Sequence, residues 1–146
     1  MYHLIYTSRS TLPQLPESGI YHLLSACSVR NRVRDITSVL AYRSGVFIGY
    51  IEGRREDVLD LYTRIEIDPR HLSCRILAED EHRERWFPGI YMGYLNEQET
   101  ASHSKLFDEE LNHSHAGAIL EMFRHAQQHP ETIEHRIKHE ISRNAR

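Results

Sequence analysis

Short runs of apolar residues, separated by polar turns, predict a mixed sheet with two helices. Five runs rich in β-branched and aromatic residues predict strands at about 2–7, 36–42, 46–52, 73–82 and 90–95. Between them, apolar residues recur three and four positions apart and predict one helix from about Ser18 and another over about 55–67. The inward stripes are Ile20, Leu23, Leu24 and Cys27 on the first helix, and Val58, Leu61, Tyr62 and Ile65 on the second. The order β-α-β-β-α-β-β predicts an α+β, ferredoxin-like sheet with an added strand.

The C-terminal third carries two further amphipathic stretches. The first, at about 115–129, places Ile119, Met122, Phe123 and Ala126 on one side. Two helices cover only one face of a sheet, so we expect this C-terminal helix to cover the second face. The second stretch spaces Ile133, Ile137 and Ile141 every fourth residue and predicts a short tail helix that docks on the domain or on a second copy. We therefore expect a core at 1–95 and a helical extension of the same domain at 96–146.

Composition narrows the class of protein. The chain has 146 residues, 40% hydrophobic and 27% charged, as expected for one globular domain. A net charge of −3 argues against general affinity for nucleic acid. No apolar run is long enough to span a bilayer, no secretion signal is evident, and Cys27 and Cys74 have no CxxC spacing. These features predict a cytoplasmic protein without disulfides.

Two histidine pairs raise the question of a metal site. His125 and His129, and likewise His135 and His139, have the i, i+4 spacing of two ligands on one helix face. Neither pair has an evident third ligand, and no HExxH motif occurs. We therefore interpret both pairs as part of a solvated face and predict no metal.

Four separate segments carry a resemblance to a known family. They read LIYTS (4–8), NRVRDITS (31–38), GVFIGYIEG (45–53) and RWFPGIYMG (85–93). Their order and spacing resemble the BLUF domain, which senses blue light with a flavin. The match covers residues 1 to about 95 and extends in composition to about 129.

The resemblance implies a flavin slot between the two helices that pack on the sheet. Tyr6, Asn31 and Met92 match family positions near the flavin ring, and strand alternation puts Tyr6 and Gly49 on faces that meet under it. Further contacts to the ring or to the flavin tail are implied for Arg30, Arg64, Asp68 and His71. The implied cofactor is FAD, with FMN or riboflavin as alternatives, bound weakly or not at all.

Each of these residues also has a plainer interpretation. Tyr6 is then a core tyrosine, Met92 a core filler, and Asn31 a helix C-cap just past the first helix. Arg64, Asp68 and His71 are then a surface charge cluster at a helix end. Ile90, not Trp86, occupies the position where the family has a tryptophan. We expect Trp86 to cap the connection between the fourth and fifth strands.

The chain departs from the family at its key glutamine, which Gly49 replaces. In the family, that amide changes its hydrogen bonds after an electron passes from the tyrosine to the flavin. A primary amide has donors and an acceptor that can exchange directions, and glycine has none. We expect a gap at Gly49 that water could fill. Ser38, in place of a family glycine, is a milder departure.

Three functions are compatible with these residues. The first is a flavin-binding blue-light sensor that acts through an unknown downstream protein, or as a homo-oligomer, with a doubtful photocycle. The second is a flavin-free interaction module on the same fold, and the third is a flavin enzyme. The enzyme ranks last because no substrate acid or base is evident, so we assign no catalytic residue. Gly49 fits a degenerate binder, an interaction module, or a photoreceptor altered at this position naturally or by engineering.

Overall fold

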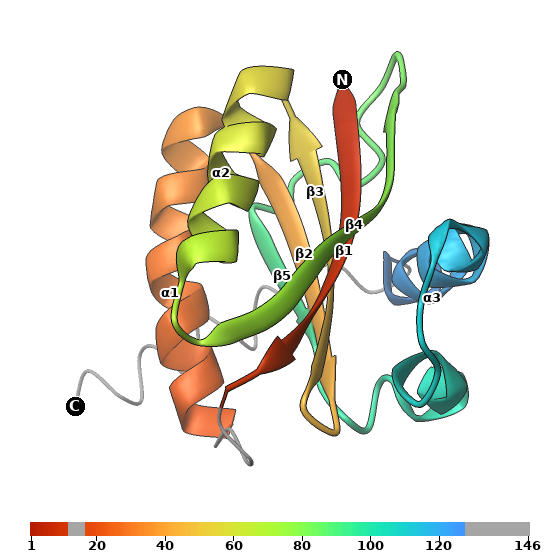
Figure 1. Ribbon diagram of the computed structural model, residues 1–146. Coiled ribbons are helices and arrows are strands. Elements are labelled where there is room, and N and C mark those ends of the chain that lie inside the picture. Colours follow the sequence, from red (N-terminus) through yellow and green to blue (C-terminus); the bar gives the residue numbers. More distant parts are fainter. Residues whose placement is uncertain (12–16, 128–146) are drawn as a thin grey trace.

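The computed structural model describes residues 1–11 and 17–127 and contains a five-stranded sheet of order β4-β1-β3-β2-β5 (Figure 1). The strands are β1 (Tyr2–Ser10), β2 (Thr37–Arg43), β3 (Val46–Gly53), β4 (His71–Glu81) and β5 (Met92–Leu95). Neighbouring strands are antiparallel except β2 and β5, which are parallel. The predicted α+β, ferredoxin-like fold is confirmed.

Helices lie on both faces of this sheet (Figure 1). Helices α1 (Glu17–Arg34) and α2 (Arg55–Ile67) cover one face. Helix α3 (Ala116–Gln127) covers the other, together with the short 3₁₀ helices η1 (Ala101–Phe107) and η2 (His113–His115). The predicted cover of the second face is confirmed, whereas the predicted tail helix lies outside the described residues. The division into a core at 1–95 and an extension stays a prediction.

Strand β1 is longer than its apolar run predicted. It continues to Ser10 because its polar end pairs on both sides, Arg9 with Val46 of β3 and Ser10 with His71 of β4. Backbone pairing does not depend on apolar side chains, so the pattern underestimates such a central strand. Strand β5 is shorter than predicted and begins only at Met92, where pairing with Ser38 starts.

Two apolar cores result, one on each face of the sheet. The core under α1 and α2 holds Tyr6 and Met92, while the core under α3 holds Tyr50 and Phe123. The helix stripes agree with the pattern, with Ile20, Leu24, Val58 and Tyr62 buried and Leu23, Cys27, Leu61 and Ile65 half-buried. Among the described residues, no helix is long and apolar enough to cross a membrane.

Candidate functional site

A cavity of about 290 Å³ opens between α1 and α2. Its walls are mostly apolar, with one amide and three guanidinium groups among them: Cys27, Val29, Arg30, Asn31, Val33, Arg34, Ile36, Leu61 and Arg64 line it. A largely apolar wall with a few polar groups is typical of a small-molecule site. Three predicted site residues, Arg30, Asn31 and Arg64, therefore meet in one cavity.

Asn31 is the buried polar group of this cavity. It lies inside the last turns of α1, not past the helix, and only 3% of it is exposed. Its Nδ2 donates to the backbone oxygen of Tyr91 at 2.8 Å and lies 3.9 Å from Met92 Sδ. The interpretation of Asn31 as a C-cap is wrong, because α1 runs on to Arg34 and the left-handed residue after it is Asp35, at φ 54°. Asn31 instead ties α1 to the start of β5.

Tyr6 and Gly49 are direct partners in the pairing of β1 with β3. Tyr6 faces the helices, as strand alternation predicted, and lies in the core with Phe47 and Ile51. The expected gap at Gly49 is wrong, because the Tyr6 ring covers that position. A Cβ on Gly49 would come closer than 3.0 Å to three atoms of the Tyr6 side chain, two in the ring and the hydroxyl oxygen. The glutamine's place is thus taken by the phenol itself.

Tyr6 is enclosed between the sheet and the two helices. It is 3% exposed, and its ring meets that of Tyr62 edge-on with 5.8 Å between centroids. Burial raises the pKa of Tyr6 above its ordinary value, and the nearby thiols of Cys27 and Cys74 raise it further. Tyr6 does not line the cavity, but Cys27 does. Cys27 is therefore a wall residue of the cavity that also lies near the phenol.

The rim of the cavity is a charge bridge between the two helices. Asp60 contacts Arg34 of α1 at 2.5 Å and Arg64 of its own helix at 3.3 Å. The hydrogen bond from Arg34 holds the pKa of Asp60 below its ordinary value. Sequence reasoning missed Arg34 and Asp60. The i, i+4 spacing of Asp60 and Arg64 was a usable signal, whereas nothing local pointed to Arg34.

Asp68 and His71 do not line the cavity. Asp68 is held by Arg70, whose Nε and Nη2 donate to its two carboxylate oxygens at 2.9 and 2.5 Å, and these bonds lower the pKa of Asp68 to about 2. His71 Nδ1 is 2.7 Å from Ser8 Oγ, and burial lowers its pKa. Asp68 lies in the connection from α2 to β4, and His71 is the first residue of β4. Their predicted contact with a flavin tail stays a prediction.

The metal prediction is only partly covered by the structure. His129, His135 and His139 lie outside the described residues, so neither histidine pair can be followed. Within residues 1–11 and 17–127, no group of three or more histidine, cysteine or acidic side chains is placed to hold a metal ion.

Comparison with known proteins agrees with this geometry. The family model described as "Sensors of blue-light using FAD" matches residues 1–93. The beta subunit of the photoactivated adenylate cyclase of Euglena gracilis is 36% identical over 90 residues, which is 61% of this chain and 10% of that protein. The chain thus spans about a tenth of the length of the curated relatives it matches.

Two solved structures of similar size share the fold. The dark-state structure of BlrB, a BLUF protein, has a TM-score of 0.65 and 31% identity, covering 69% of this chain and 76% of that one. The ground state of BlsA has a TM-score of 0.71 over 82% of this chain and 85% of that one, and at 23% identity it supports the fold alone. With nearly two thirds of its length matched by the family model, the chain belongs to the BLUF family of blue-light sensors that use FAD.

Proposed function

We propose that this chain holds FAD between α1 and α2 and signals blue light to a partner protein. The observation that carries the proposal is the cavity between these helices, with the buried Asn31 amide in its wall. Its apolar sides suit a flat ring, and the amide suits the polar edge of that ring. When bound, a flavin supplies absorption of blue light and acceptance of an electron.

The size and charge of the cavity favour a flavin with phosphates. About 290 Å³ is at the small end for ligand sites, so the ring would occupy the cavity and the tail would run along its rim. Arg30 and Arg64 at the rim are suited to phosphate, because a guanidinium group presents several donors in a planar fork. Asp60 engages Arg64 at present and would compete with a phosphate for it.

Tyr6 is the proposed electron and proton donor of the site. The phenol lies in the apolar core near Cys27, a residue of the cavity wall. Gly49 offers no side-chain group that could store a changed hydrogen bond. We therefore expect the chain to hold flavin more weakly than relatives with glutamine, and to use a shortened photocycle.

The first test is an absorption spectrum of the purified protein before and after blue light. Yellow protein supports the site, and partial loss of flavin on dialysis agrees with the weaker binding. Flavin that stays bound in equal amount to the chain after dialysis would contradict the weaker binding. Colourless protein that cannot be loaded with FAD would overturn it in favour of an interaction module, and bleaching by a substrate would indicate an enzyme.

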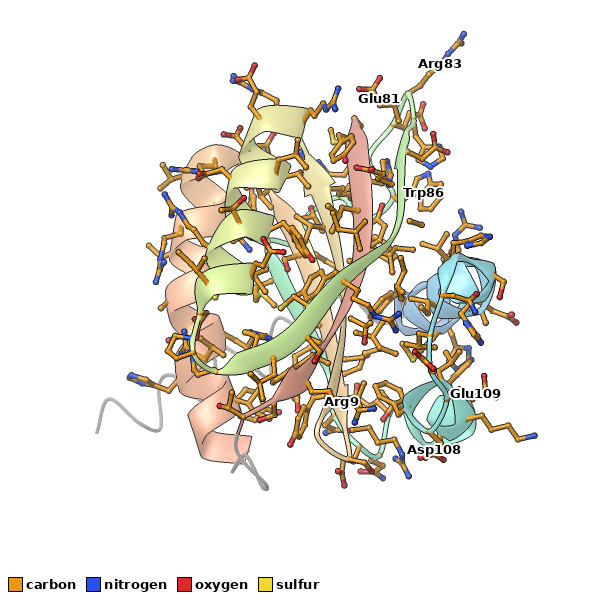
Figure 2. The ribbon with its side chains drawn as sticks, in the orientation of Figure 1. Arg9, Glu81, Arg83, Trp86, Asp108 and Glu109 are labelled. Carbon is orange, nitrogen blue, oxygen red and sulfur yellow. The ribbon has the colours of Figure 1, made fainter. Side chains whose placement is uncertain are left out.

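The identity of the flavin is tested with the rim arginines. Arg64→Gln should weaken binding of FAD and FMN while leaving riboflavin unchanged, because only the first two carry phosphate. Dissociation constants from quenching of flavin fluorescence give the comparison. The matched control is Arg83→Gln, an exposed arginine that points away from the molecule in the connection after β4 (Figure 2). Equal losses for all three flavins would contradict phosphate recognition by Arg64.

A further inference from the structure

A second cleft, of about 230 Å³, lies on the opposite face of the sheet. It is bounded by β1, β3 and β4, by the connection after β4, and by α3, with His3, Tyr50, Asp80, His82, Trp86 and Ala116 among the residues that line it. Figure 2 shows Trp86 on the α3 side of the sheet. The sheet separates this cleft from the cavity between α1 and α2, so the two cannot share one ligand.

A buried hydrogen-bond chain connects Glu52 to Tyr50 and His3, two residues that line the cleft. Glu52, with 0% exposed, accepts the backbone N–H groups of Trp86 and Phe87 at 2.9 and 2.8 Å. It also accepts the Tyr50 hydroxyl at 2.8 Å. Tyr50 has a single hydroxyl hydrogen, which this bond uses. The Tyr50 oxygen also contacts His3 Nδ1, so we assign the His3 hydrogen to Nδ1, where it donates to Tyr50.

This assignment leaves His3 Nε2 as a lone-pair acceptor. His3 is only 4% exposed, and its Nε2 has no hydrogen-bond partner among the residues that the structure describes. Burial, together with the charges of His82 and the N-terminal amine, lowers the pKa of His3 to about 4, so the ring is neutral at pH 7. A buried acceptor without a donor is unfavourable, and a ligand that donates a hydrogen bond would relieve it.

The walls of the cleft are suited to a flat apolar body. The rings of His3, His82 and Trp86 pack against one another, with centroids 4.2, 4.6 and 4.1 Å apart, and form one aromatic wall. Arg124 covers the Trp86 ring from α3, while Asp80 and Glu79 carry the opposite charge at the rim, where Glu79 accepts the Tyr2 hydroxyl. Charges of both signs surround the opening, so neither an anion nor a cation is favoured.

We propose that this cleft binds a small uncharged aromatic molecule with one hydrogen-bond donor, of the phenol or indole class. The ligand displaces the His82 ring, which packs against His3 at 4.2 Å, and then donates to the covered His3 Nε2. A cavity of roughly 150 Å³ is enough for a benzene ring, so the cleft has room for one ring with a polar substituent. The site is independent of flavin and of the proposed light response.

The test uses the full chain, in the dark and at constant flavin content, with phenol as the probe. Trp86 is the only tryptophan, so its fluorescence reports binding at the cleft itself. Phenol should bind about tenfold more tightly than anisole, which has the ring and the oxygen but no donor. Equal affinity for the two would overturn the proposal.

Two variants locate the site. Ala116→Leu fills the cleft from α3 and should abolish phenol binding, whereas Ala118→Leu, exposed on the same helix, should not change it. Unchanged phenol binding in Ala116→Leu would contradict the assignment. His3→Asn keeps an amide near Tyr50 but lacks Nε2, so it should lose the preference for phenol over anisole.

A measurement on the native chain covers the case in which His3→Asn fails to fold. In protein labelled with ¹⁵N-histidine, the Nε2 resonance of His3 should move when phenol is added, because the lone pair then accepts a hydrogen bond. Anisole should leave it in place. A resonance that does not move with saturating phenol would overturn the role of His3.

Discussion

Gly49 and Tyr6 determine the light response that we expect from this chain. If flavin is bound, blue light should produce no long-lived red-shifted state, because no side chain at position 49 can donate a lasting hydrogen bond to the ring. A water molecule near this position would reorient too fast to hold a switched state for seconds. A light-minus-dark difference spectrum measures this, and a stable red shift in the unmodified chain would show that the mechanism does not need the glutamine.

Restoring the glutamine has a steric cost in this structure. The Tyr6 ring occupies the space that any side chain at 49 requires, so Gly49→Gln should lower the free energy of unfolding by about 1–3 kcal/mol. In Gly49→Gln protein that folds, the new side chain displaces the Tyr6 ring, and its amide should restore the red shift. Gly49→Ala is the matched control, with a similar steric effect and no amide. Adding Tyr6→Phe to Gly49→Gln should remove the restored shift, and a shift that survives would exclude Tyr6 as the donor.

Asn31→Ala should reduce flavin content. The change removes the amide from the cavity wall, and a missing hydrogen bond to a buried polar group costs about 1–3 kcal/mol, or roughly tenfold to a hundredfold in affinity. Flavin retained after dialysis measures the effect. Asn112→Ala is the control, because Asn112 caps the helical segment on the other face and its loss lowers stability without touching the cavity. Equal flavin retention in both variants would make Asn31 a purely structural residue.

The connection from α2 to β4 should give the protein a distinct response to acid. The folded-state pKa of Asp68 is lowered from 3.8 to about 2, chiefly by its hydrogen bonds from Arg70. Because the pKa of Asp68 is lower in the folded than in the unfolded chain, its carboxylate stabilises the fold at pH values above the unfolded pKa. This contribution is lost as the pH falls from about 4 to about 2. Arg70 is half-exposed and screened, so we expect about 1 kcal/mol.

Urea unfolding at pH 6 and at pH 2.5 measures this contribution. The native chain should lose more stability between these pH values than Asp68→Asn, which has no carboxylate to protonate. Asp57→Asn, in the first turn of α2, controls for the loss of one negative charge elsewhere in the chain. An identical acid response of the native chain and Asp68→Asn would contradict the assigned pKa.

At the level of the whole molecule, the layer formed by α3 keeps the second sheet face out of water. Phe123 is 1% exposed in the core that contains Tyr50 and Phe87. Phe123→Ala should therefore lower the free energy of unfolding by about 3–5 kcal/mol. Glu121→Ala, exposed on the same helix, should have little effect. Thermal unfolding by circular dichroism compares the two, and a small loss for Phe123→Ala would mean that α3 contributes little to the core.

Local pattern was enough to predict the element order, the face on which Tyr6 and Gly49 lie, and the helix that covers the second face. These properties depend on residues two to four positions apart, and that spacing can be read directly from the sequence. The motifs around Tyr6, Asn31 and Met92 likewise indicated the family, because each lies within one short segment. The same reasoning misjudged Asn31, since the end of α1 depends on its docking against Tyr91, 60 positions away.

Strand order and register determined the remaining features, because they bring together residues that no local pattern connects. The register of β1 with β3 puts the Tyr6 ring over Gly49 and so removes the expected gap. The docking of α2 on α1 joins Asp60 to Arg34, 26 positions earlier. The same register brings His3 to Tyr50, and the connection after β4 brings Trp86 to Glu52. Along the chain His3 is a single histidine in a strand, and only its buried, unpartnered Nε2 in the folded protein indicates a second site.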